Sequence, residues 1–167
     1  MNADISDFPD PVASLVHAFR LSPHPEGGFF REVYSGPSGL ALFSDKKRSL
    51  CSHILFLLTR RGRSRFHRID ADELWHHYEG ASVTIIELRK GAVTKVTQLG
   101  KADEESLTHV VPAGTWFGAF VQLEHEYALV GCTVSPAFEY SKFELGSRDA
   151  LKCMFPDADG YIDLLCD

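Results

Sequence analysis

The chain has 167 residues, of which 44% are hydrophobic and 24% are charged, the ordinary balance of one globular domain. Lys and Arg number 17 against 23 Asp and Glu, so the net charge is −6. An acidic chain is not expected to bind nucleic acid, which requires a basic face. No apolar run approaches the roughly 20 residues of a membrane helix, and the acidic N-terminus lacks the pattern of a secretory signal.

The cysteines are scattered along the chain and form no CxxC pair. They are Cys51, Cys132, Cys153 and Cys166. Reduced thiols that serve as small hydrophobic residues fit this pattern better than a disulfide framework does. We therefore expect a cytoplasmic protein whose partner is a small molecule, without a nucleic-acid or membrane partner.

The first predicted element is a helix that begins near Asp10. Its carboxylate suits the N-cap, and Pro11 suits the first helical position, where the backbone amide has no partner. Apolar residues then recur at helical spacing, at Val12, Leu15, Val16 and Phe19. Pro23 and Pro25 end the helix, and we assign residues 1–22 to an N-terminal helical segment.

After the helix the pattern is one of short strands separated by turns. The expected strands are 29–35, 49–58, 64–67, 72–78, 82–88, 93–99, 108–112, 115–121 and 127–134. Lys90–Gly91 suits a two-residue hairpin between two of them. Many short strands of this kind predict an all-β sandwich or barrel over residues 23–146. A short helix is expected over 148–155, within a C-terminal extension, 147–167, packed on the barrel.

Two motifs resemble those of the cupin superfamily. The first cupin motif sets Gly, His-x-His, Glu and Gly at fixed intervals, and its counterparts here are Gly62, His67, Glu73 and Gly80. The second contains Pro-x-Gly-x-x-His, and its counterparts are Pro112, Gly114 and Phe117. Together with HPEGGFFRE, DELWHHYEG and VVPAGTWFGA, they look like the cupin-type family of unknown function whose barrel is similar to that of the deoxysugar-nucleotide epimerases of rhamnose synthesis. The resemblance covers residues 15–145 and implies a double-stranded β-helix (a jelly-roll barrel) and a homodimer.

This chain departs from a metal-binding cupin, which supplies His, His, Glu and His. Ile69 stands in place of the second histidine and Phe117 in place of the last, and neither side chain can ligate a metal. The remaining ligands are fewer than the three that open zinc and iron sites use. A divalent metal would need His77 to join His67 and Glu73. Other histidines that could serve are His53 and His109. Without such a recruit we expect no cofactor.

His67 and Glu73 are the candidate catalytic pair, with His77 beside them. Glu73, Trp75 and His77 share one face of a strand, because side chains alternate along it. An imidazole and a carboxylate in an apolar pocket make a general acid/base pair, and the carboxylate would fix the tautomer of the ring. The alternative is a structural hydrogen bond between strands.

The candidate binding residues surround this pair. Trp75 and Trp116 suit a stacking platform for a sugar ring or a base, with simple filling of the core as the alternative. Glu26 lies in the HPEGG turn, and Arg31 after it could hold a phosphate or carboxylate in bidentate fashion. The residues expected near the barrel rim are Ser135, Phe138 and Tyr140.

These residues favour a metal-independent enzyme, similar to an epimerase or isomerase, acting on a small polar metabolite such as a nucleotide-linked sugar. His67 would abstract a proton next to a carbonyl, Glu73 would orient the imidazole, and the tryptophans would hold the ring. In the rhamnose epimerases a His base works with an Asp partner and a Tyr acid, and no tyrosine of this chain is assigned to that role. A binding module that leaves its ligand unchanged and a metal-dependent oxygenase or isomerase are the alternatives.

Overall fold

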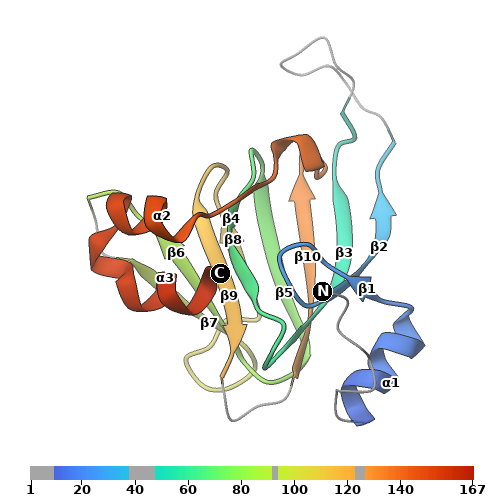
Figure 1. Ribbon diagram of the computed structural model, residues 1–167. Coiled ribbons are helices and arrows are strands. Elements are labelled where there is room, and N and C mark those ends of the chain that lie inside the picture. Colours follow the sequence, from blue (N-terminus) through green and yellow to red (C-terminus); the bar gives the residue numbers. More distant parts are fainter. Residues whose placement is uncertain (1–9, 38–47, 92–93, 123–126) are drawn as a thin grey trace.

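The protein folds into two antiparallel sheets that pack together as a jelly roll (Figure 1). The computed structural model describes residues 10–37, 48–91, 94–122 and 127–167. The first sheet contains, in spatial order, β1 (Ser22–Pro23), β2 (Phe29–Ser35), β3 (Ser52–Thr59), β10 (Tyr127–Ser135), β5 (Asp72–Gly80) and β8 (Thr108–Val111). The second contains β11 (Glu144–Leu145), β4 (Ser64–Arg68), β9 (Trp116–Val121), β6 (Val83–Leu88) and β7 (Lys95–Leu99). This architecture confirms the all-β cupin fold that the resemblance implies.

Large aromatic side chains fill much of the space between the sheets. Phe56 of β3, Trp75 of β5 and Phe117 of β9 are almost completely buried there. The ring centroids of Phe56 and Trp75 are 6.0 Å apart, and those of Trp75 and Phe117 are 6.3 Å apart. Edge contacts of this kind contribute about 1 kcal/mol each beyond the burial of area. This part of the barrel is therefore solid.

The N-terminal helix, α1 (Asp10–Phe19), confirms the first predicted element. Val12 and Val16 of α1 pack in one cluster with Leu57 of β3 and Leu129 of β10. Because Leu57 and Leu129 alternate with inward-facing neighbours, α1 covers the outer face of the first sheet. Within the described ranges, no helix has the length and apolar character needed to cross a bilayer.

Short helices at the C-terminal end cover the outer face of the second sheet (Figure 1). α2 (Arg148–Met154) matches the predicted helix, and a 3₁₀ turn at Pro156–Ala158 leads into α3 (Asp159–Leu165), which the amino-acid pattern did not predict. Side chains of both helices pack against those of the sheet, in a cluster that includes Leu151, Ile162, Leu165, Phe66, Ile86, Leu88 and Trp116. The indole of Trp116 therefore lies outside the barrel, beneath the helices.

β6 and β7 pair as an antiparallel hairpin, with Glu87 opposite Lys95. β6 ends at Leu88 and β7 begins at Lys95, so the connection is longer than the predicted two-residue hairpin at Lys90–Gly91. Gly91 within this connection has a φ of 67°, which favours glycine. Residues 92–93, which follow, lie outside the described residues.

Candidate functional site

A small cavity lies between the two sheets, with β4 on one side and β2, β3, β5 and β10 on the other. Its volume of about 80 Å³ is enough for several water molecules or a small ligand group. It is lined by His24, Glu26, Phe30, Glu32, Ser52, Ile54, Phe56, His67, Ile69, Glu73, Cys132, Val134, Phe138 and Tyr140. Glu32 and Tyr140 are exposed and mark its mouth, whereas Glu26, His67 and Glu73 are buried.

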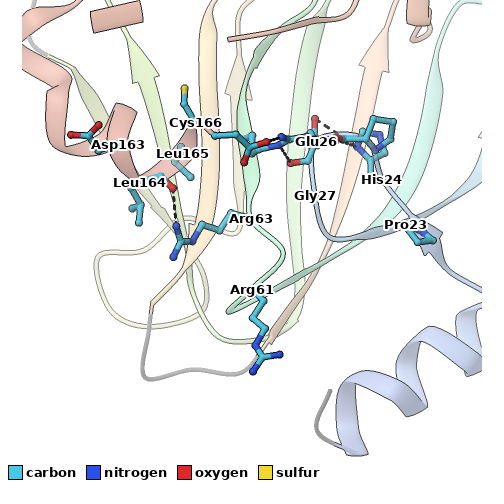
Figure 2. A pocket seen from close by; sticks show the side chains of 13 residues that line it. Pro23, His24, Glu26, Gly27, Arg61, Arg63, Asp163, Leu164, Leu165 and Cys166 are labelled. Carbon is cyan, nitrogen blue, oxygen red and sulfur yellow. Dashed lines mark hydrogen bonds and ion pairs between the residues drawn. The ribbon is translucent and has the colours of Figure 1, made fainter. Parts of the chain in front are cut away.

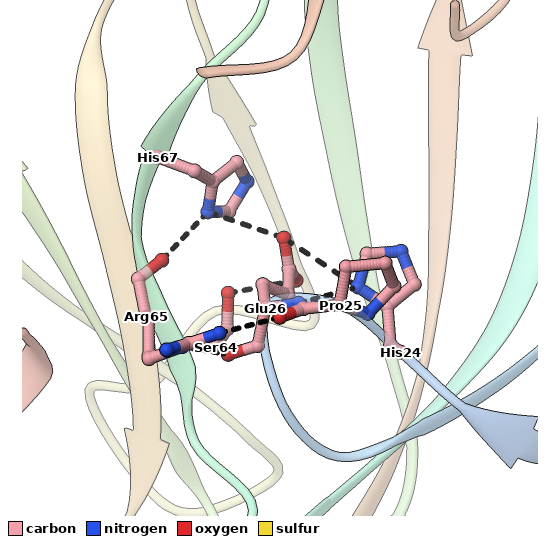
Figure 3. A network of polar contacts seen from close by, with 6 residues as sticks. All are labelled: His24, Pro25, Glu26, Ser64, Arg65 and His67. Carbon is pink, nitrogen blue, oxygen red and sulfur yellow. Dashed lines mark hydrogen bonds and ion pairs between the residues drawn. The ribbon is translucent and has the colours of Figure 1, made fainter. Parts of the chain in front are cut away.

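The ring of His67 is held in one tautomer by two oxygen atoms (Figure 3). Its Nδ1 lies 2.8 Å from the carbonyl oxygen of Arg65 and 3.2 Å from Oε2 of Glu26. A backbone carbonyl can only accept, so Nδ1 carries the hydrogen and Nε2 keeps its lone pair. Burial lowers the pKa of His67, and the charge of Glu73 opposes this only in part. At neutral pH the imidazole is therefore neutral and can accept a proton at Nε2.

Glu26 reaches His67 because the loop at 24–28 folds against the start of β4. The backbone amide and the side-chain Nε of Arg65 both donate to the Glu26 carbonyl oxygen, each over 3.1 Å. Gly27 has a φ of 119°, and a Cβ there would overlap the Arg63 carbonyl oxygen, so the turn requires glycine. Ser64 Oγ donates to Oε1 of Glu26 over 2.9 Å. Burial raises the pKa of Glu26.

Glu73 enters the cavity from β5 and is the second buried carboxyl group. Burial raises its pKa from its ordinary 4.5 to about 7, against the opposing effect of His67 and with a smaller contribution from the negative charge of Glu26. Burial also raises the pKa of the neighbouring Cys132 thiol well above 9.0, so this group stays protonated. At neutral pH a large fraction of Glu73 is therefore a carboxylic acid, which can donate a hydrogen bond.

The structure brings four of the predicted site residues to this cavity: His67, Glu73, Glu26 and Phe138. The expected arrangement of the first two needs a correction, because among the described residues no hydrogen bond joins Glu73 to His67. The partner that fixes the tautomer is Glu26, with the Arg65 carbonyl. Sequence separation hid this contact, since only the fold brings the 24–28 loop beside β4.

The other predicted residues do not line the cavity. Trp75 and His77 do share the inward face of β5 with Glu73, as the alternation predicts, but Trp75 packs between Phe56 and Phe117. His77 lies farther along the strand, where its Nε2 contacts the Ala81 carbonyl oxygen at 2.9 Å. The expectation that both line one pocket is therefore wrong, because aromatic rings fill the barrel beyond Glu73.

Trp116 and Arg31 are absent from the lining for a different reason, which is strand parity. Trp116 points to the outer face of β9, where it packs under the C-terminal helices and beneath the Arg68 guanidinium, 4.7 Å from the ring centroid. On β2, Phe30 and Glu32 face the cavity, so Arg31 between them faces outward. Their predicted binding roles have no support from this geometry.

Sequence reasoning missed several lining residues that were within its reach. His24 shares the HPEGG turn with Glu26, and Phe30 and Glu32 follow it at the alternating spacing of a strand. Tyr140 was not missed, because it was expected near the barrel rim. It belongs to the 3₁₀ turn at Tyr140–Lys142 and packs edge-on against Phe138, with ring centroids 4.9 Å apart. The alternation along β2 was the available signal for Phe30 and Glu32.

The residues present do not fit the metal centre of a metal-binding cupin. Ile69 lines the cavity at one ligand position, and Phe117 packs on His67 at another, with ring centroids 4.2 Å apart. In the part of the chain that the structure describes, no group of three or more His, Cys, Asp or Glu side chains is placed to hold a metal ion. The ligand set of His67, Glu73 and His77 is thus not assembled. The other possible recruits lie elsewhere: His53 bonds Thr133 and His109 bonds Glu87.

The sequence matches the family described as Cupin superfamily (DUF985) over residues 13–146. The chain belongs to this family. A hypothetical protein from Leishmania major is 28% identical, with a TM-score of 0.85 over 92% of this chain and 97% of that one. A protein from Shewanella oneidensis is 35% identical, with a TM-score of 0.84 over 92% of this chain and 96% of that one.

More distant likenesses extend to the fold alone. Oxalate decarboxylase from Bacillus subtilis is 13% identical, with a TM-score of 0.55 over 86% of this chain and 36% of that one. A cupin-2 domain protein from Rhodospirillum rubrum is 16% identical, with a TM-score of 0.59 over 88% of this chain and 89% of that one. A search of curated proteins found no match.

Proposed function

We propose that this cupin is an isomerase-like or epimerase-like enzyme that moves a proton next to a carbonyl group of a small polar metabolite. The observation that carries the proposal is the pairing, in one cavity, of two groups. One is a neutral imidazole whose Nε2 bonds none of the described residues, and the other is a carboxyl group of which a large fraction is protonated at neutral pH. In an ordinary His–Glu ion pair the imidazole carries the proton and the carboxyl group is ionised, whereas here the carboxyl group carries the proton. The pairing supplies a base and an acid at the same pH.

The chemistry assigns different work to the two groups. Nε2 of His67 takes the proton from the carbon next to the carbonyl, while the Glu73 carboxylic acid gives its proton to the carbonyl oxygen, leaving a neutral enol. The imidazolium that forms is stabilised by Glu26 at its Nδ1–H and by the carboxylate of Glu73. In the return steps His67 delivers its proton to carbon and Glu73 recovers its own. Glu26 is thus the positioning residue and Glu73 the acid.

The lining of the cavity bears on the class of metabolite. Only a small group fits within about 80 Å³, and Phe138 and Tyr140 at the mouth offer apolar faces to a ring or another planar group. The described lining contains no Lys or Arg, so a diphosphate finds no cationic partner there. These features favour a small carbonyl compound over the nucleotide-linked sugar that the family resemblance suggested.

Solvent-deuterium exchange tests the proposal. The purified protein is incubated in D₂O with a panel of small ketoses, aldoses and keto acids, and ¹H NMR follows the loss of the proton next to the carbonyl. We expect catalysed exchange that falls at least about 100-fold in His67→Ala, the usual contribution of a general base. His76→Ala is the matched control, because His76 lies on the opposite face of β5 and bonds Thr133.

Two results would contradict the proposal. One is exchange by the wild type that stays at background across the whole panel. The other is exchange that survives in His67→Ala.

A binding module is the second candidate, favoured by the small size of the cavity and its largely apolar lining. A panel member that binds tightly and is recovered without deuterium would support it. The homodimer and the cytoplasmic location stay predictions, and sedimentation velocity tests the first of them.

A further inference from the structure

A second, larger cavity lies on the other side of the loop at 24–28. It is an open groove of about 740 Å³ between this loop, the segment that leads into β4 and the end of α3 (Figure 2). Arg61, Arg63 and Arg65 all line it. The groove and the inner cavity share His24 and Glu26, so the 24–28 loop forms a wall between them.

Two of the three guanidinium groups are held in place by backbone oxygens. Arg63 Nη1 donates to the Leu164 carbonyl over 2.7 Å (Figure 2), and Arg65 donates to the carbonyls of Pro25 and Glu26. Arg61 is exposed and makes no hydrogen bond or ion pair with the residues that the structure describes. Each guanidinium has five N–H donors, so fixed donors remain available in the groove.

The acidic residues of the groove only partly balance this charge. Asp163 already pairs with Lys152 and lies 3.9 Å from Arg148. Asp167 places its carboxylate on Nη1 of Arg65. Its side chain is 81% exposed, and an ion pair of such exposure is weak and easily exchanged.

We propose that this groove is an anion site, which takes the phosphate or carboxylate group of a small ligand. The anion replaces the Asp167 carboxylate on Arg65, whose guanidinium the carbonyls of Pro25 and Glu26 hold in place. Arg63 and Arg61 add positive charge farther along the groove, and Figure 2 shows Arg61 directed away from Glu26. Arginine suits this task because its planar fork matches the oxygens of both groups. Since Arg65 also holds the Glu26 carbonyl, the bound anion lies against the loop that positions Glu26 beside His67.

The test uses the 167-residue chain and titrates it with inorganic phosphate and, separately, with acetate, by isothermal calorimetry and ¹⁵N NMR. We expect Arg65→Gln to weaken binding about tenfold, the usual loss of one charge-assisted contact. Arg61→Gln is the matched control: it removes the same charge from the same groove, but the Arg61 side chain points away from Glu26 (Figure 2). Asp167→Asn should tighten binding severalfold, because it removes the internal competitor.

The relative affinities for phosphate and acetate identify the preferred anion. Equal weakening in Arg65→Gln and Arg61→Gln would overturn the site, since it would mean that only net charge matters. Unchanged binding in Asp167→Asn would overturn the exchange of carboxylates on Arg65. Neither result depends on deuterium exchange in the inner cavity, so this proposal and the proposed function fail separately.

Discussion

Replacing Glu73 by Gln should change how the stability of the protein depends on pH. Glu73 is buried, and burial raises its pKa from 4.5 to about 7 in the folded state. Between these two pH values the folded carboxyl holds a proton that the unfolded chain has lost. The free energy of unfolding therefore contains a term that is fully present below about pH 4.5 and is lost as the pH rises through about 7.

The magnitude follows from the two pKa values. At 1.36 kcal/mol for each pH unit, the wild type should lose about 3 kcal/mol of stability relative to Glu73→Gln across this window. Glutamine is close in shape to the protonated acid and does not titrate. The difference between the two proteins thus isolates Glu73 from the other buried groups of the cavity.

The assay is urea unfolding followed by tryptophan fluorescence, repeated at intervals from about pH 4.5 to about pH 8, over which the term is lost. Glu32→Gln is the matched control, because Glu32 lines the same cavity but is exposed. A wild-type-minus-Glu73→Gln difference that is flat with pH, or that grows as the pH rises, would refute the reasoning. It would mean that the Glu73 carboxyl is ionised and well solvated in the folded protein.

Replacing Glu26 by Gln should lower the rate of deuterium exchange about tenfold or more, the usual effect of removing a carboxylate that orients a histidine. Circular dichroism should show an intact fold, because the Gln side chain can still accept the hydrogen bond from Ser64. Cys132 should resist alkylation in the folded protein, since burial raises its pKa well above 9.0, whereas the exposed Cys153 should react. Peptide mass spectrometry compares the two rates, and equal rates would contradict the burial of the Cys132 thiol. Trp116→Ala should lower the free energy of unfolding by about 3 kcal/mol or more without slowing deuterium exchange. A folded variant that no longer catalyses exchange would mean that Trp116 does belong to the site.

The sequence was most informative where a local pattern decides the structure. Alternation placed Glu73, Trp75 and His77 on one face of β5, and the helical spacing from Val12 to Phe19 placed α1. The spacing of the first motif identified His67 and Glu73, and both side chains line the same cavity. Each of these predictions depends on neighbours within a few residues.

The errors arose where contacts between residues far apart in the sequence determine the structure. Alternation fixes the face of a strand but not how deep a cavity reaches, and Phe56 with Phe117 closes the space around Trp75. α3 is only seven residues long and contains a glycine, so its periodicity is weak and its packing over Trp116 was missed. The contact of Glu26 with β4 spans 39 residues of sequence and has no local signal.

The state of His67 tests the central claim most directly. ¹⁵N NMR of the histidine side chains, with the His67 signals assigned by their disappearance in His67→Asn, reports the protonation of each ring nitrogen. At pH 7 we predict a neutral ring with hydrogen on Nδ1 and a bare Nε2, as its contacts with Arg65 and Glu26 require. A cationic ring at that pH, or a neutral ring with hydrogen on Nε2, would contradict the assignment of His67 as the base.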